Sequence, residues 1–264
     1  MKIGFIGGGN MASAMIGGIL SQKIVRADEV TVSTKTDKSR KRVEETYHIR
    51  TTLDNCEVAK SCDVLFLAVK PQFYEKVIAQ VRDVIRNDQI VVSIAPGKTL
   101  RWLEELFGRP VKLIRCMPNT PALVGEGMTG VCANSLVTEE EKKMIQTLLE
   151  GCGKVEIVEE SLMNTVVSVS GSSPAYVFLF IEAMADAAVA DGMTRAQAYR
   201  MAAQAVLGSA KMVLETGKHP GELKDMVCSP GGTTIEAVRV LEEKGMRSAV
   251  IEAMKACTEK AKGC

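Results

Sequence analysis

The stretch MKIGFIGGGNMASAMIGGIL (residues 1–20) decides the fold of the first half of the chain. A short apolar strand, Lys2 to Ile6, runs into a glycine-rich turn and then into a helical pattern. Gly7, Gly9 and Ala12 match the motif G-x-G-x-x-G/A, whose glycines let backbone amides approach a pyrophosphate at the positive end of the following helix. Glycine-rich turns are common, so the motif takes its weight from the strand that precedes it. Together they predict a dinucleotide-binding, Rossmann-like unit.

The alternation of strands and helices supports this fold independently of the glycines. The segment DVLFLAV (Asp63–Val69) is a continuous apolar run, typical of a buried parallel strand. Further strands are expected at Glu29–Ser33, Gln89–Ala95, Val111–Cys116 and, at an edge, Gly153–Val158, and helices at Gln72–Arg86, Thr99–Phe107 and Glu139–Glu150. This alternation predicts an α/β fold, a doubly wound sheet over residues 1–160.

Residues 161–264 show a helical pattern only. Helices are expected at Ser173–Ala190 and Thr194–Gly217, and shorter ones from Gly221, Thr233 and Arg247. The first of these is apolar nearly all round, so it needs partners on every face. One small helical domain and a sheet can scarcely surround it. We therefore expect an all-helical C-terminal domain that packs against its twin in a homodimer.

Composition excludes several classes of function. The net charge of +1 gives no reason to expect a nucleic-acid or anionic-membrane partner. The longest apolar stretch, Ala175–Ala190, is short for a membrane span and carries Glu182 and Asp186, so no transmembrane helix is expected. The eight cysteines form no CxxC pair and no Cys/His metal spacing, and no signal peptide precedes them. We expect reduced thiols, no metal and a cytoplasmic protein.

The end of the second strand indicates which dinucleotide is bound. NAD-binding proteins usually place an acid there, on the adenosine ribose 2′-hydroxyl. Here Ser33, Thr34 and Lys35 occupy that place, and hydroxyls with a cation suit the 2′-phosphate of NADPH. Two alternatives stay open: the basic residues that follow form a solvated helix start, or Asp37 is the acid because the strand ends later.

Two other strand ends and one loop have the composition of a binding site. The segments AVKP (Ala68–Pro71) and SIAPG (Ser93–Gly97) end strands in proline-containing turns. They either border the nicotinamide or simply terminate the strands. The loop MPNTPALVGEGMT (Met117–Thr129) is long for a connector, which favours a functional role.

The sequence offers little acid–base chemistry. Its two histidines, His48 and His219, are poorly placed, and His219 before Pro220 is expected to flank a helix. Reduction of an already protonated imine needs less acid–base help than oxidation of an alcohol. The segment SPGGTTIEAV (Ser229–Val238) brings two glycines and two threonines to a helix start, which suits a substrate carboxylate, although a plain helix cap is the simpler interpretation.

Five segments closely resemble the pyrroline-5-carboxylate reductase family: GFIGGGNMA, FLAVKP, MPNTPALVGEGMT, SGSSPAY and LKDMVCSPGGTTIEAVRVLE. The resemblance runs from the first strand to the last helix. It implies reduction of L-1-pyrroline-5-carboxylate to L-proline with NADPH or NADH, the last step of proline biosynthesis. It also implies an interlocked dimer through the helical domain, often assembled further into decamers. Ser173 departs mildly from the glycine that many members have there.

The resemblance also implies site residues. Among the cofactor contacts, Lys35 is predicted from its position at the end of the second strand and not from the resemblance. The cofactor-binding residues would be Ile6, Gly7, Gly8, Gly9, Asn10, Met11, Thr34, Lys35, Asn55, Ala68, Val69, Lys70, Pro71, Ala95 and Gly97. The substrate-binding residues would be Ser172, Gly231, Gly232, Thr233 and Thr234, with Thr234 as the catalytic residue.

Two other functions compete with this one. Enzymes of the β-hydroxyacid dehydrogenase type also join a Rossmann domain to a helical one, but they depend on a lysine in an early helix of the second domain. Residues 161–190 contain no lysine, which counts against that class. A dinucleotide sensor would bind NADPH and a partner protein without turnover, and it would not need the glycine–threonine helix start.

Replacing Lys35 by Asp is expected to shift the cofactor preference from NADPH toward NADH, because a carboxylate repels the 2′-phosphate and accepts a hydrogen bond from a 2′-hydroxyl. The ratio of kcat/KM for the two cofactors measures the shift. An unchanged ratio would show that the strand end is misinterpreted.

Overall fold

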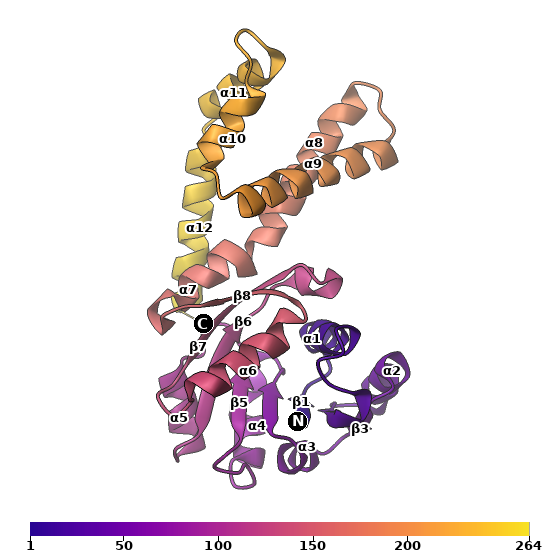
Figure 1. Cartoon of the computed structure of the whole chain (residues 1–264), viewed down its shortest axis with the longest axis vertical. Helices are drawn as coiled ribbons and strands as arrows, with labels where there is room; N and C mark the ends of the chain where they lie inside the picture. The colour runs from indigo at the N-terminus through magenta and orange to yellow at the C-terminus, as the bar shows by residue number, and fades with distance from the viewer. Residues whose placement is uncertain (264) are drawn as a thin grey trace. The chain divides into compact units, whose positions relative to one another are not determined.

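A computed structural model describes residues 1–263 of the chain (Figure 1). The chain divides into two compact units, one of residues Met1–Ser172 with the chain's end from Cys257, the other of Ser173–Ala256. The division falls later than the start of the helical sequence, because the first helical turns pack with the sheet: Met163 lies in its hydrophobic core. The last helix, α12 (Met246–Lys262), contributes to both units.

The first unit is built on an eight-stranded sheet in the order β3-β2-β1-β4-β5-β6-β7-β8. All neighbours are parallel except β6 and β7. The strands are β1 (Ile3–Ile6), β2 (Val30–Ser33), β3 (Arg50–Thr52), β4 (Val64–Leu67), β5 (Ile90–Ser93), β6 (Lys112–Met117), β7 (Gly127–Ala133) and β8 (Gly153–Ile157). The predicted doubly wound sheet is confirmed, and its strand order reverses between β1 and β4, where such sheets bind their ligands.

Helices cover both faces of the sheet because consecutive strand residues point to opposite sides. One core joins α1 (Asn10–Ser21), α2 (Asp37–Tyr47) and α6 (Glu139–Glu150) to the face that carries Phe5. The other joins α3 (Asn55–Ser61), α4 (Tyr74–Val81) and α5 (Leu100–Phe107) to the face that carries Ile6. Across β1 and β4, the rings of Phe5 and Phe66 stack with centroids 4.6 Å apart.

Two strands were not predicted. The segment Met117–Thr129, expected as one long loop, holds a 3₁₀ turn at Thr120–Val124 and the start of β7. β7 contains two glycines, which weaken a strand signal, and it is stabilised by pairing with β6 on one side and β8 on the other. β3 has only three residues and none is buried, so it leaves little hydrophobic pattern.

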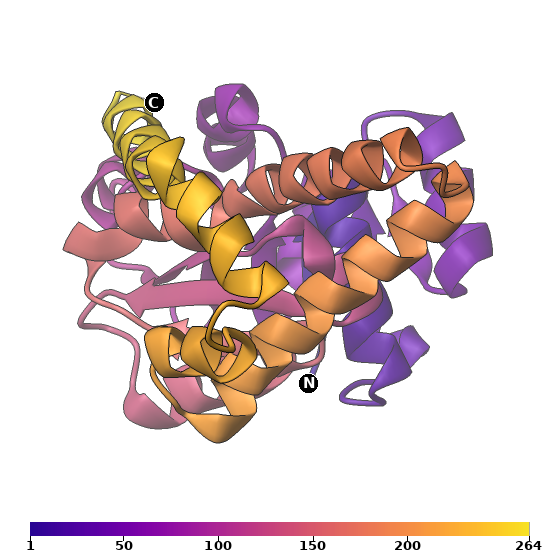
Figure 2. The same cartoon turned by 90° about the horizontal axis from the view of Figure 1, so that it is seen from above.

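The second unit contains helices only, as predicted. They are α8 (Ser173–Ala190), α9 (Arg195–Thr216), α10 (Pro220–Val227), α11 (Thr233–Glu243) and the first part of α12. α8 and α9 lie side by side (Figures 1 and 2). Within one chain only Pro174 and Ala185 of α8 are buried, whereas Phe178 and Leu179 are 62% and 68% exposed. The apolar surface of α8 therefore lacks a cover in a single chain.

The apolar helical run is longer than the sequence predicts. Helical turns extend from Glu160 to Ala190, well before Ala175, through α7 (Met163–Val166) and a π-helical turn at Val167–Gly171. Its most apolar 18-residue window has a mean hydropathy of 1.4, and 11% of that window is buried. By length and composition it is sufficient for a membrane span.

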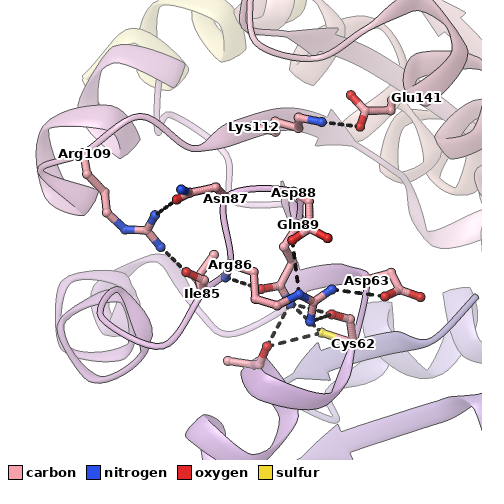
Figure 3. A network of polar contacts seen from close by, with 11 residues as sticks. Cys62, Asp63, Ile85, Arg86, Asn87, Asp88, Gln89, Arg109, Lys112 and Glu141 are labelled. Atoms are coloured by element: carbon pink, nitrogen blue, oxygen red, sulfur yellow. Dashed lines mark hydrogen bonds and ion pairs between the residues drawn. The ribbon is translucent and has the colours of Figure 1, made fainter.

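A dense polar network lies at the amino ends of the strands, away from the edge where such sheets bind ligands (Figure 3). The fully buried Gln89 donates to the carbonyl oxygens of Ala59 and Cys62, both at 2.8 Å. Arg86 contacts Asp63 and the Cys62 carbonyl oxygen. Burial raises the pKa of the Cys62 thiol to about 12, so the thiol stays protonated and unreactive. The network is structural: it ties the start of β4 to the start of β5.

A buried ion pair fixes the start of the helical segment to the sheet. Arg115 in β6 is buried, and its Nη1 lies 3.3 Å from Glu160 Oε1. The same oxygen accepts a hydrogen bond of 2.6 Å from the amide of Leu100, the first residue of α5. Glu160 thus neutralises a buried cation and satisfies a helix-end amide that has no partner within the helix.

Replacing Glu160 by Ala is expected to lower the free energy of unfolding by about 3 kcal/mol, the low end for a broken buried pair, because the carboxylate is 33% exposed. Replacing Glu139, which pairs with Lys142 on the surface of α6 and is 84% exposed, is the matched control. That variant should lose about 0.5 kcal/mol or less. Urea denaturation measures both; equal losses would contradict the role given to Glu160.

Candidate active site

The turn after β1 lies directly against the end of β4. The Gly7 amide donates to Ser33 O and the Ala68 amide donates to Ile6 O, both at 2.9 Å. Gly7 has φ +110°, and a Cβ there would lie 2.5 Å from the Ala68 carbonyl oxygen. Only glycine fits this position, so the first motif glycine allows the close approach of the two strand ends at the point of reversal.

Gly9 has a different role. It is the N-cap of α1 without a side-chain cap, and a Cβ there would meet nothing within 4 Å. The first turn of α1 contains no acidic residue. The amides at a helix start have no partners within the helix and attract anions. The space in front of α1 is therefore open and suited to a pyrophosphate.

The end of β2 lies where the sequence predicts it. β2 ends at Ser33, so Asp37 is not the strand-end residue; it begins α2 and pairs with Arg40 at 3.0 Å. Thr34 is buried, and its hydroxyl donates to Thr36 O at 3.1 Å. Lys35 Nζ lies 5.5 Å from the centre of the Phe73 ring. Lys35 is thus the cation next to the strand end, whereas Arg40 is engaged within its own helix.

Two polar side chains connect this region to the glycine turn. Asn55, the first residue of α3, accepts a 2.7 Å hydrogen bond from Ser33 Oγ and donates to Gln80 Oε1 at 2.8 Å. Arg42 in α2 donates to Gly8 O at 2.6 Å. Arg42 was not predicted as a site residue, although the basic run after β2 contains it. It holds the turn from the side of α2 and adds a second cation there.

The predicted nicotinamide contacts occupy the same carboxyl edge of the sheet. Ala68 and Val69 follow β4, and Lys70 and Pro71 lead into a 3₁₀ turn at Pro71–Phe73. Ala95 and Gly97 follow β5, the next strand in the sheet. The structure therefore brings together the three strand ends that the sequence predicts as the cofactor site.

The loop after β6 supports Ser172. The buried Asn119 donates to Ser170 O at 3.0 Å and accepts from the Met128 amide at 2.9 Å. The π-helical turn ends with a 2.7 Å hydrogen bond from the Ser172 amide to Val167 O. Such turns are frequent at functional sites. Neither Asn119 nor the π-helical turn was predicted as part of the site. The unusual length of the loop Met117–Thr129, which contains Asn119, did predict a functional role for that segment.

Ser172 is also contacted from the far end of the chain. The thiol of Cys257 donates to Ser172 Oγ at 3.3 Å, and Thr258 Oγ1 donates to Ser168 Oγ at 2.8 Å. Both residues lie in the part of α12 that belongs to the first unit. No local pattern near residue 172 predicts these contacts.

The glycine–threonine segment lies in the second unit. Gly231 has φ +66°, and Gly232 is the N-cap of α11 without a side-chain cap. Thr233 and Thr234 are the first two helical residues, and within residues 1–263 neither hydroxyl has a hydrogen-bond partner. The segment therefore caps α11 through Gly232 and not through a threonine side chain, and both hydroxyls stay available for a ligand.

The histidines have structural positions. His219 is the N-cap of α10, and its Nδ1 accepts a 3.0 Å hydrogen bond from the Gly221 amide, which confirms the helix-flanking role. His48 ends α2 in the left-handed region with φ +54°. Neither arrangement provides a general base.

Comparison with known proteins identifies the family of the chain. The family described as pyrroline-5-carboxylate reductase dimerisation matches residues 160–264, and the family described as NADP oxidoreductase coenzyme F420-dependent matches residues 2–97. The pyrroline-5-carboxylate reductase of Escherichia coli (strain K12) is 54% identical over 259 residues, 98% of this chain and 96% of that protein.

Solved structures of pyrroline-5-carboxylate reductases are similar to this chain over its full length. A pyrroline-5-carboxylate reductase from Coxiella burnetii has a TM-score of 0.93 and 35% identity, covering 99% of this chain and 97% of that one. Plasmodium falciparum pyrroline carboxylate reductase with NADP bound has a TM-score of 0.89 and 32% identity, covering 100% and 97%. The chain belongs to the pyrroline-5-carboxylate reductase family.

Proposed function

We propose that this protein reduces the C=N bond of L-1-pyrroline-5-carboxylate to give L-proline, with NADPH or NADH as the reductant, and so performs the last step of proline biosynthesis. One observation supports this most directly. A helix start with two glycines and two unpartnered threonine hydroxyls offers a carboxylate site, in a chain whose first unit has the turn of a dinucleotide-binding sheet. Neither histidine of the chain is among the predicted site residues, and reduction of a protonated imine needs less acid–base help than oxidation of an alcohol.

The residues of the chain bind and orient the reactants. The bound dihydronicotinamide supplies the hydride that the imine carbon accepts, and a protonated imine needs no further proton for this step. Gly231 and Gly232 expose backbone amides, and the Thr233 and Thr234 hydroxyls donate to the substrate carboxylate, with Thr234 as the catalytic residue in this orienting sense. Glu236 in the first turn of α11 is neutralised by Arg239 at 2.7 Å, so it repels the carboxylate less. Ser172, in the first unit, is a further predicted substrate-binding residue.

The cofactor contacts form three groups. The pyrophosphate would be held before α1, the adenosine beside β2 and α3, and the nicotinamide at the ends of β4 and β5. The groups are Ile6, Gly7, Gly8, Gly9, Asn10 and Met11; Thr34, Lys35 and Asn55; and Ala68, Val69, Lys70, Pro71, Ala95 and Gly97. We favour NADPH over NADH because Lys35 follows β2 directly and no acid stands at the strand end.

The chain acts as a cytoplasmic homodimer in this proposal. Residues 1–160 form the dinucleotide-binding domain and 161–264 the substrate-binding and dimerisation domain. A second copy covers the exposed apolar residues of α8, in place of a membrane, and Glu182 and Asp186 on that helix disfavour lipid. The seven described cysteines are unpaired, which suits a reducing compartment.

Dimers assemble further into decamers in this proposal. Sedimentation over a dilution series measures the mass of the assembly, and an active monomer would refute the dimer.

The direct test adds NADPH and pyrroline-5-carboxylate to the pure protein and follows nicotinamide absorbance and proline. Turnover with proline formation supports the reductase. Binding of NADPH with no loss of absorbance at saturating substrate would instead support a dinucleotide sensor.

Replacing Thr234 by Val should reduce kcat/KM for pyrroline-5-carboxylate by a free energy of about 1.5–3 kcal/mol, because a charge-assisted hydrogen bond is lost. NADPH affinity and folding should stay almost unchanged. Thr216→Val is the matched control, since the hydroxyl of Thr216 bonds only to nearby main chain: it donates to Met212 O at 2.7 Å and accepts from the Lys218 amide at 3.3 Å. Unchanged kinetics for Thr234→Val would remove this residue from the site.

Two glycine variants separate cofactor binding from folding. Gly9→Ala places a methyl group in the open space before α1, so NADPH affinity should fall by about tenfold or more while the melting temperature is kept. Gly7→Ala should destabilise the fold by about 2 kcal/mol, because its Cβ meets the Ala68 carbonyl oxygen at 2.5 Å. Binding is followed by NADPH fluorescence. Wild-type affinity for Gly9→Ala would place the pyrophosphate elsewhere.

A further inference from the structure

A single buried hydroxyl connects the carboxyl ends of β4 and β5. Tyr74, the first residue of α4, donates from its hydroxyl to Leu67 O at 2.5 Å. The phenol oxygen of Tyr74 also accepts hydrogen bonds, from Ser93 Oγ at 3.2 Å and from the Ile94 amide at 3.3 Å. Leu67 and Ser93 are the paired last residues of the two strands. Tyr74 and Ser93 are both fully buried.

The chain of hydrogen bonds continues to Ala95. Its amide donates to Ser93 Oγ at 3.5 Å, so a relay runs from Ala95 through Ser93 and Tyr74 to the carbonyl group of Leu67. Leu67 directly precedes Ala68. The relay therefore joins the two turns that border the nicotinamide in the proposed function, and it does so beneath them, inside the protein.

The relay is rigid. The Tyr74 ring lies in the hydrophobic core between α4 and α5, with its centroid 6.3 Å from that of Trp102. Burial raises the pKa of Tyr74 to about 12, so the hydroxyl keeps its proton and its bond to Leu67 O at working pH. Leu67 O, Ser93 Oγ and the Ile94 amide all bond to the phenol, so a phenylalanine of the same shape would remove three hydrogen bonds from buried groups.

We propose that Tyr74 is a positioning residue for hydride transfer. Its hydroxyl sets the spacing between the Ala68 and Ala95 turns and thereby the position in which the nicotinamide binds. This inference rests on the proposed reductase function. Tyr74 touches neither substrate nor cofactor. It acts on the nicotinamide end of the site, whereas Gly9, Thr34 and Lys35 bind the other end.

The test compares Tyr74→Phe with Tyr47→Phe. Tyr47 is a matched control, since its hydroxyl also donates to a main-chain oxygen, Ser13 O at 2.9 Å, on the opposite face of the sheet. For Tyr74→Phe, kcat at saturating NADPH should fall about tenfold, while KM for NADPH stays within about twofold. The deuterium isotope effect on kcat, measured with NADPH deuterated at the transferred position, should rise because hydride transfer becomes slower than product release. For Tyr47→Phe, kcat and the isotope effect should match the wild type.

Each outcome has one meaning. A wild-type protein without turnover overturns the proposed function and, with it, the positioning role; the outcomes that follow overturn the positioning role alone. An active wild type with Tyr74→Phe equal to Tyr47→Phe in kcat and isotope effect overturns the positioning role. A loss confined to KM for NADPH, or a fall in kcat that follows only the fraction of unfolded protein seen by circular dichroism, also overturns it.

A second variant keeps the test valid if Tyr74→Phe unfolds. Ser93→Ala cuts the relay toward Ala95 but leaves the bond from Tyr74 to Leu67 O in place. It should give a smaller fall in kcat with the same rise in isotope effect. Where both variants fold, the double variant should lose less than the product of the two single effects, because both cut one relay. A wild-type isotope effect in Ser93→Ala, or fully multiplicative effects in the double variant, would overturn the proposal.

Discussion

The close approach of β1 and β4 at their carboxyl ends is the constraint on which the rest of the cofactor site depends. Gly7 lies against the Ala68 carbonyl oxygen at a distance that excludes any side chain. This contact holds the glycine turn, the amide-lined start of α1 and the segment after β4 at one edge of the sheet. Arg42 supports the turn from α2, and Tyr74 ties the neighbouring end of β5 to β4. Polar contacts on the opposite edge serve the fold instead.

The absence of a histidine from the predicted site residues is consistent with the division of the chemistry. A reduced nicotinamide supplies the hydride, and the carbon of a protonated imine is already electrophilic. The protein therefore mainly has to hold two anionic groups, a pyrophosphate and a carboxylate. Both proposed sites use the same device, a glycine-containing turn before a helix without a side-chain cap. The two threonines at the second helix start add hydroxyl donors that the first lacks.

Much of the fold and of the site follows from local patterns. The apolar run Asp63–Val69, the G-x-G-x-x-A turn and the position of Ser33 at the end of β2 were all predictable, because each depends on short-range periodicity or on a residue type that a turn requires. β7 was not, because its glycines carry no strand signal and its pairing with β6 and β8 comes from segments distant in sequence. The extent of the apolar helical run was underestimated, because the π-helical turn continues it back to Glu160.

The sequence by itself determined the fold class, the order of its elements and the two glycine-rich helix starts, since these depend on residues that are neighbours along the chain. Only the tertiary structure decided which polar side chains support the site. Asn119 reaches Ser170, Cys257 reaches Ser172 and Tyr74 reaches Ser93. These contacts bridge residues far apart in sequence, and their geometry exists only once the sheet and helices have packed. A hydrogen bond needs both partners within about 3 Å, and no local pattern encodes that distance.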